Sequence, residues 1–328
     1  MTPLRFERLH QDEWAELAAR LEAMRRRKDQ ATLLEGSQPS AERITALYRR
    51  TCEHLALARE RAYPTYLIAR LEQLTEEAHQ TIYYQRVFGL GALRRMITDG
   101  FPRAVRRDAA YVGVAAAVFV IPTIVLGLIV YWSPELILSM MSPDQAAGFD
   151  QMYSPAARAI GRARTADTDW VMFGFYIQNN ISVAFRFYAS GIFVGIGSIF
   201  FMLLNAVFGG AVGGYLTERG LGETFYSFVV THAAFELTAF VLAGAAGLRL
   251  GHSLLAPGRQ TRLQSLTQAA RESMVMVYGI IAMLLIAAAI EAFWSSARWL
   301  PLPLKYSVAG VCWLAVLSYL TLQGRSED

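Results

Sequence analysis

The sequence predicts an all-α fold: a polytopic α-helical membrane protein with five to six membrane crossings, preceded by a cytoplasmic helical region. Residues 170–216 contain one formal charge, Arg186, whereas about 18 apolar residues already suffice to span a bilayer. Charge is concentrated at the front, where residues 1–108 hold 19 of the 31 basic and 15 of the 27 acidic side chains. We therefore expect a cytoplasmic region over 1–104 and a transmembrane domain over 105–328.

The front region is predicted to form three helices, because its apolar residues recur at helical spacing between charged ones. A Gly- and Pro-containing break at 35–39 ends the first helix. Ser40 is a suitable N-cap for a second helix over 41–61. Pro64 separates this helix from a third, which is expected over 65–88.

A basic segment precedes the first predicted span, residues 109–132. Its arginines are Arg94, Arg95, Arg103, Arg106 and Arg107. Basic residues next to a span favour the cytoplasmic side, so we expect a bacterial inner-membrane protein with a cytoplasmic N-terminus. Although the isoelectric point is near 9.1, the position of these arginines favours anionic lipid headgroups along Arg94–Arg107 as partners, and no nucleic acid.

The polar residues 133–169 are predicted to lie outside the cytoplasm. Helical patterning is weak there, and Ser142-Pro143-Asp144 and Ser154-Pro155 are typical of a turn or a helix start. An external partner would meet this segment.

Two topologies fit the later apolar runs, which are 224–247, 274–294 and 306–322. If residues 170–216 cross once, the basic loop 248–273 lies outside, against the charge rule. If they cross twice, as short or broken helices hinged near Gly191–Gly197, that loop and the C-terminus are cytoplasmic. We favour the double crossing.

Polar residues within or beside the apolar runs are expensive in a membrane and are usually paired or functional. They form a candidate intramembrane polar network: Asn179, Asn180, Arg186, Asn205, His232, Glu236, Arg249 and Glu291. His232 and Glu236 are four residues apart and share one helix face. A zinc helix of the HExxH type has a second histidine, so we interpret them as a buried polar pair and predict no metal, cofactor or catalytic residue. Glu291 either reaches the interface beside Trp294 or forms an ion pair with Arg186, His232 or Arg249.

Glycines at four-residue spacing let helix backbones approach closely. The candidate packing glycines are Gly191, Gly195, Gly209, Gly210, Gly213 and Gly214. The two pairs between Asn205 and Gly214 favour a homodimer packed through this segment, and the alternative is packing against the protein's own spans.

Several motifs follow one another in a specific order. They are N-N-x-x-V-A-F at 179–185, G-I-x-x-G-I at 191–196, N-A-V-x-G-G-x-x-G-G at 205–214, H-x-x-x-E-L-x-A at 232–239, A-A-G-L-R-L-G at 245–251 and I-E-A-F-W-S at 290–295. This order resembles the SpoIIM (stage II sporulation protein M) family over about residues 105–322. The first 100 residues resemble the cytoplasmic extension of long, non-sporulation members.

The resemblance implies an integral membrane scaffold of the cell envelope without catalysis, associated with cell-wall hydrolases and, in long members, with a MoxR-type AAA ATPase. A transporter, channel or lipid-moving protein is the alternative if the polar residues line a cavity. An intramembrane hydrolase is a second alternative, which the missing ligand set disfavours.

Overall fold

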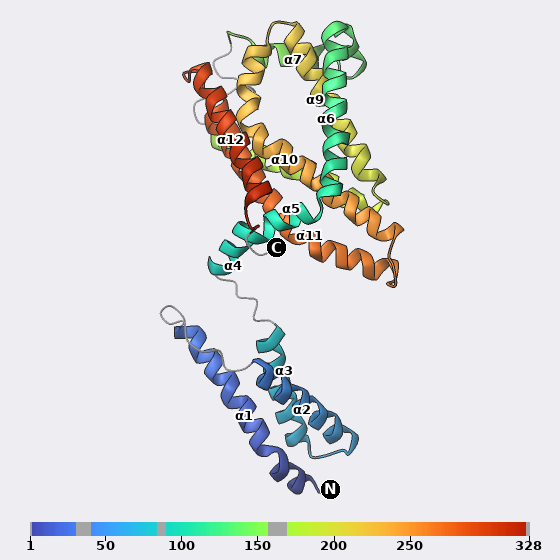
Figure 1. Ribbon diagram of the computed structural model, residues 1–328, viewed down its shortest axis with the longest axis vertical. Helices are drawn as coiled ribbons and strands as arrows, with labels where there is room; N and C mark the ends of the chain where they lie inside the picture. The colour runs from blue at the N-terminus through green and yellow to red at the C-terminus, as the bar shows by residue number, and fades with distance from the viewer. Residues whose placement is uncertain (1, 31–40, 84–89, 157–168, 326–328) are drawn as a thin grey trace. The chain divides into compact units, whose positions relative to one another are not determined.

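The computed structural model describes residues 2–30, 41–83, 90–156 and 169–325, and all of their regular structure is helical (Figure 1). The chain divides into two compact units, Met1–Gly89 and Leu90–Asp328. The expected boundary at 104/105 falls inside the second unit. The reason is Phe101, which is buried against the membrane helices and whose ring fills the space next to Gly279.

The first unit contains three helices, α1 (Pro3–Gln30), α2 (Ala41–Glu60) and α3 (Thr65–Tyr83). Trp14, Leu17 and Leu47 belong to its buried core, and the Trp14 indole donates to His54 Nδ1 at 3.1 Å. The three predicted helices are therefore confirmed. The predicted break at 35–39, the Ser40 cap and the end of the third helix lie outside the described residues.

The second unit contains the membrane helices and their short connections. Its elements are α4 (Leu90–Arg95), η1 (Met96–Gly100), α5 (Phe101–Arg107), α6 (Ala109–Trp132), η2 (Pro134–Ser139), α7 (Pro143–Tyr153), α8 (Asp169–Ala189), η3 (Ser190–Ile192), α9 (Ile196–Glu218), α10 (Gly222–Leu255), α11 (Arg262–Ala289), η4 (Ile290–Ser295) and α12 (Leu302–Leu322). The predicted helix start at Ser142 is confirmed, because the Ser142 hydroxyl accepts a hydrogen bond from the backbone N–H of Gln145 in the first turn of α7.

Five helical segments are long and apolar enough to cross a membrane: α6, α9, α10, α11 with η4, and α12. A sixth helix, α8, runs antiparallel to α11 over a comparable length. The Trp170 ring contacts Phe293 at one end, and the Tyr188 hydroxyl bonds Ser273 at the other. Residues 170–216 form two helices, as the predicted double crossing requires, and the turn between them contains Gly195 at φ 81°. The membrane crossing of α8 itself stays a prediction.

The 248–273 segment is not the loop that hydropathy predicted. The preceding helix α10 continues to Leu255, and α11 already begins at Arg262. Its arginines do not end the helix, because Arg249 bonds both Asp108 and Glu272. A capping box between Thr261 and Gln264 starts α11.

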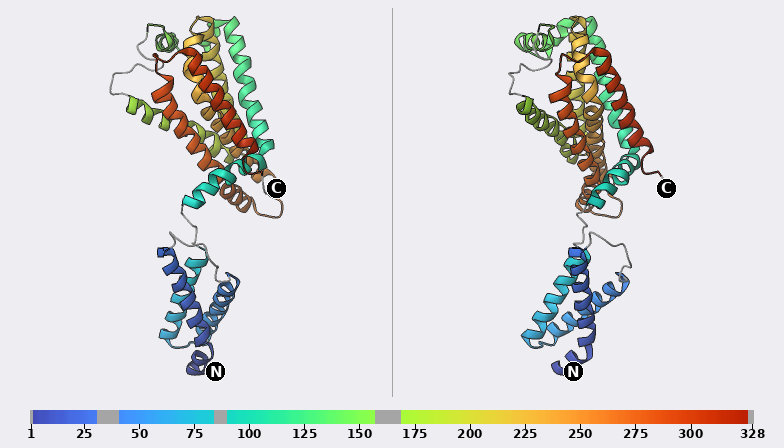
Figure 2. Two further views of the ribbon diagram at one scale, coloured as in Figure 1. Left: turned by 60° about the vertical axis from the view of Figure 1, so that its left-hand side comes forward. Right: turned by 90° about the vertical axis from the view of Figure 1, so that its left-hand side faces the viewer.

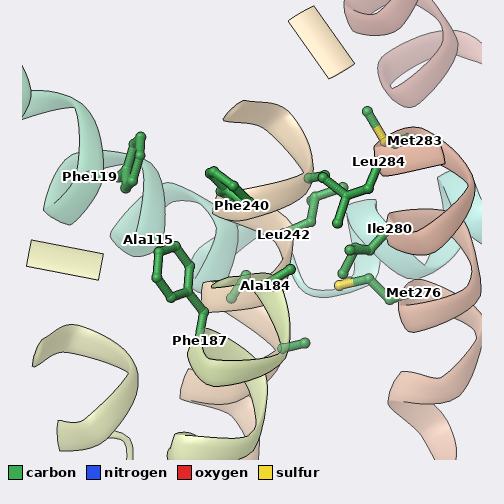
Figure 3. Packing of buried hydrophobic residues seen from close by; sticks show 14 of the residues in the cluster. Ala115, Phe119, Ala184, Phe187, Phe240, Leu242, Met276, Ile280, Met283 and Leu284 are labelled. Carbon is green, nitrogen blue, oxygen red and sulfur yellow. The ribbon is translucent and has the colours of Figure 1, made fainter. Parts of the chain in front are cut away.

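The helix α10 contacts α6, α8, α9, α11 and α12 and is thus central to the second unit (Figure 2). Aromatic side chains from three helices meet beside it, with Phe119 and Phe187 both next to Phe240 (Figure 3). Met276 and Ile280 of α11 extend this apolar core. The core fixes the relative positions of α8, α10 and α11, and polar residues come together on α8, on α10 and on η4, which continues α11.

Candidate functional site

His232 and Glu236 lie one turn apart on α10, close to its middle. The imidazole is 5% exposed, and the Phe228 ring packs edge-on against it. The distance from His232 Nε2 to Glu236 Oε2 is 3.9 Å, which exceeds a hydrogen bond. The two side chains therefore face one another without direct bonding.

The short π-helical segment η4 brings two more polar residues to His232. Ser295 Oγ lies 3.0 Å from His232 Nδ1, and Glu291 is buried on the same segment. The potential ligand atoms of His232, Glu236 and Glu291 all lie within 4.8 Å of one another. Single-turn π segments are frequent at functional sites, and this one directs Glu291 and Ser295 toward the same imidazole.

Asn180 of α8 completes this group, which we call the polar cluster: Asn180, His232, Glu236, Glu291 and Ser295. Asn180 is 2% exposed and lies against the Glu236 carboxyl group. Nevertheless, Asn180 Nδ2 and Glu236 Oε2 are both buried without a hydrogen-bond partner of good geometry among the described residues. Such atoms are costly inside a protein.

Lys305 is a neighbour of the polar cluster that the sequence reading missed. Its ammonium group is buried and donates to the Ser295 carbonyl oxygen at 2.9 Å. The last apolar run was expected to begin at residue 306, so Lys305 fell just outside it. Helix α12 instead begins at Leu302, which places the lysine within the helix. Lys305 is one of two lysines in the chain, and this rarity is the sequence feature that could have drawn attention to it.

Among the remaining members of the expected network, Asn179 bonds to the edge of the polar cluster and the others bond elsewhere, so the single network is corrected to separate sites. Exposed Asn179 donates to Asn180 Oδ1, Arg186 bonds the Ser182 carbonyl near the end of α8, and Asn205 donates to the Phe201 carbonyl. Arg249 lies 13 residues after Glu236 on the same helix, which corresponds to about 20 Å. Arg186, His232 and Arg249 were the expected ion-pair partners of Glu291. Of these three, the structure places His232 close to Glu291.

The basic segment before α6 is divided between protein contacts and the exposed surface. Arg103 and Arg106 donate to carbonyl oxygens at the end of α12, and Arg107 pairs with Asp108. Arg94 and Arg95 remain exposed. The predicted partnership with anionic lipid headgroups stays a prediction that depends on these two arginines, whereas the other three hold the helix ends together.

The packing glycines also divide into two kinds. A Cβ atom added at Gly191 would lie 2.1 Å from the Gly247 carbonyl oxygen, and one at Gly210 would lie 2.3 Å from that of Thr123. These contacts lie inside the second unit. Gly209, by contrast, has nothing within 4 Å and lines a groove of about 500 Å³ between α6, α9 and α10.

The remaining predicted glycines follow this division. Gly214 packs tightly against α6, Gly195 adjoins Gly251 of α10, and Gly213 has only ordinary contacts with Phe225 and Tyr226. One of the two pairs between Asn205 and Gly214 is thus used internally. The homodimer stays a prediction that depends on Gly209 and Gly213.

Comparison with protein families assigns the second unit. The family model for Stage II sporulation protein M matches residues 115–296, more than half of the chain. The chain belongs to the SpoIIM family. Residues 4–84 match a domain of unknown function, DUF8413, which lies within the first unit.

The resemblance read from the sequence motifs is therefore confirmed, including the N-terminal extension. The comparisons with curated proteins and with solved structures give no match. All five residues of the polar cluster, from Asn180 to Ser295, lie inside the matched SpoIIM region.

Proposed function

We propose that this SpoIIM-family protein is a non-enzymatic scaffold of the bacterial inner membrane that holds cell-envelope partners at the bilayer. The partners that fit are a MoxR-type AAA ATPase on the cytoplasmic side and cell-wall hydrolases on the outer side. The observation that carries the proposal is the first unit, a compact helical body with its own core. Such a body offers a folded docking surface on the same chain as the membrane helices.

The surface of the first unit supports this role because it is densely charged and rigidly arranged. Ion pairs connect its helices, with Arg43 bonded to Glu16 and Arg59 to Glu72. Exposed pairs of this kind add little stability, whereas fixed charge patterns guide partner choice and association. The arginines before α6 support a cytoplasmic location for this unit.

The burial of the polar cluster favours the scaffold over the transporter. A transport pathway needs its polar groups to line a hydrated cavity, as in channels and carriers. Asn180, His232 and Glu291 are instead enclosed between α8, α10 and η4, each at most 9% exposed. A hydrolase would likewise need water to reach these polar groups, which their burial disfavours.

The experiment is recruitment of a purified MoxR-type ATPase to proteoliposomes that contain the full chain. We expect co-sedimentation with the full chain and a large loss with a variant that lacks residues 1–89. A second variant, Trp14→Ala, removes a core side chain that is 1% exposed and should weaken recruitment without touching the membrane unit. Equal recruitment by the full chain and the truncated variant would overturn the proposal for this partner.

A further inference from the structure

We propose that His232, Glu236 and Glu291 bind one divalent transition-metal ion of the zinc class inside the membrane unit. The sequence pattern gave only two of these ligands, on α10. Helix packing and the π-helical segment η4 supply the third. The inference is independent of the scaffold role, since it concerns the interior of the helix bundle.

The geometry fits an ion better than a direct bond between the side chains. In a tetrahedral zinc site with ligand distances of about 2.0–2.2 Å, neighbouring ligand atoms are about 3.3–3.6 Å apart. His232 Nε2 and Glu236 Oε2 are 3.9 Å apart, so small rotamer adjustments bring both to such an ion. One nitrogen and two carboxylate oxygens form a donor set that suits zinc, manganese or iron.

The imidazole is oriented as a metal ligand requires. His232 Nδ1 lies 3.0 Å from Ser295 Oγ, so donation from Nδ1–H to this hydroxyl leaves the Nε2 lone pair directed toward Glu236. Metal-bound histidines almost always have such a partner on the other ring nitrogen. Lys305 holds the Ser295 carbonyl and thereby supports the segment that provides this partner.

A second, independent observation points to a ligand in the same place. Glu236 Oε2 and Asn180 Nδ2 are buried without partners among the described residues, although polar atoms in such positions are normally bonded. A cation beside Glu236 would satisfy the carboxylate oxygen. If the Asn180 amide group rotates, its Oδ1 atom faces the ion and can serve as a further oxygen ligand.

The charges also favour a divalent ion. Two carboxylate side chains enter a helix bundle within a membrane, where isolated charge is costly and is usually compensated. A single divalent ion balances both carboxylates, and binding to a neutral imidazole adds no further charge. A site of this kind is closed by the protein rather than by lipid or water.

The other group with metal-type side chains in the described residues, His10, Glu13 and His54, serves as a contrast. The Trp14 indole already donates to His54 Nδ1, and Glu13 forms an ion pair with Arg50. One ring nitrogen of His54 and the Glu13 carboxylate are thus already bonded within the protein. His54→Gln is therefore a matched control that removes a histidine outside the proposed site.

The experiment measures metal content and affinity in the purified full chain without a histidine tag. Protein in detergent is treated with a chelator, loaded with zinc and separated from free metal. We expect about one zinc ion per chain in the wild type and in His54→Gln. We expect less than a tenth of that in the double variant Glu236→Gln/Glu291→Gln. Absence of tightly held zinc in the wild type, or unchanged content in the double variant, would overturn the site.

A second measurement decides the proposal even if the double variant does not fold. Ser295→Ala keeps all three ligands and removes the hydroxyl that orients His232. We expect about a 10–100-fold loss of zinc affinity at unchanged stoichiometry, as for other residues that position a metal ligand. Cobalt bound to the wild type should show the ligand-field absorption of a low-coordinate nitrogen and oxygen site. An unchanged affinity in Ser295→Ala, together with a cobalt spectrum of the aqueous ion, would contradict the assignment.

Discussion

Gly214 of α9 packs against Gly127 of α6 backbone to backbone: a Cβ atom added at Gly214 would lie 2.1 Å from the Gly127 carbonyl oxygen. One turn earlier, Gly210 meets Thr123 in the same way. The two helices therefore run parallel in register, and their separation is set by the missing side chains.

The first prediction follows from this contact. Gly214→Ala should destabilise the membrane unit by roughly 1–3 kcal/mol, because the extra methyl group overpacks a backbone contact that cannot yield. Thermal unfolding in detergent measures the effect. The control is Gly113→Ala on α6, where an added Cβ meets nothing within 4 Å. If both variants melted at the same temperature, the parallel contact would not hold α6 and α9 together.

The second prediction concerns assembly. Gly209 faces open space in the groove beside α6, so Gly209→Leu should leave the fold intact and block a second copy that packs there. We expect the mass in detergent to fall from dimer to monomer. Gly113→Leu adds the same volume at another exposed helix position and should leave the mass unchanged. A monomeric wild type, or a Gly209→Leu dimer, would exclude this surface as the interface.

Hydropathy and glycine spacing in the sequence were sufficient to predict the helical fold. The low charge of residues 170–216 predicted two helices, and the glycines near their junction predicted the turn, where Gly195 adopts a positive φ. These features are local, since lipid-length apolar runs and backbone conformations depend on neighbouring residues. They need no knowledge of which helices touch.

The polar cluster was only partly predictable, because its members come together through helix packing. His232 and Glu236 share a helix face, so their proximity followed from spacing alone. Their contacts with Asn180 and Ser295 depend on how α8 and η4 pack against α10. Conversely, Arg249 was grouped with them because hydropathy reports composition and not depth along a helix.

The third prediction tests the polar cluster as a structural element. Glu236→Ala leaves the surrounding buried polar groups without a partner and should cost roughly 1–3 kcal/mol. Glu236→Gln keeps a hydrogen-bonding side chain of similar size and should retain much of the stability. Both are compared with wild type after chelation, so that bound metal does not contribute. Equal melting temperatures for wild type and Glu236→Ala would show that the carboxyl group is not structural.

The fourth prediction concerns acid sensitivity of the first unit. Hydrogen bonding from Arg43, supported by Arg20, lowers the pKa of Glu16 from 4.5 to about 2, despite an opposing effect of burial. Because the folded pKa is depressed, the contribution of this carboxylate is fully present above about pH 4.5 and is lost as the pH falls toward 2. The amide hydrogen-exchange protection factors of α1 and α2, which compare each rate with the intrinsic rate at the same pH, should therefore fall across this window.

The matched variant for this prediction is Glu16→Gln, which cannot ionise. Its protection factors should be lower than those of wild type at neutral pH and should change less between pH 4.5 and 2. Added salt should weaken the wild-type effect, because the ion pair is near the surface. A wild-type pH profile identical to that of Glu16→Gln would show that the Arg43 contact does not stabilise the unit.

The last prediction is topological and rests on the number of helices that traverse the second unit. Five segments qualify by length and composition. The sixth helix, α8, lies along α11 and η4, with Trp170 against Phe293 at one end and Tyr188 bonded to Ser273 at the other. Its hydropathy is low because it contains the polar residues Gln178, Asn179, Asn180 and Arg186. An even number of crossings returns the chain to its starting side. Consistently, Arg103 and Arg106 before α6 bond the end of α12.

Both ends of the second unit should therefore be cytoplasmic. A reporter that is active only in the periplasm should be silent when fused after Asp328 and active when inserted before α7, next to Met141. The insertion is the positive control, since it shows that the reporter can fold and be exported in this protein. Reporter activity at Asp328 would mean an odd number of crossings. In that case α8 would not cross the bilayer and would begin and end on the same side of it.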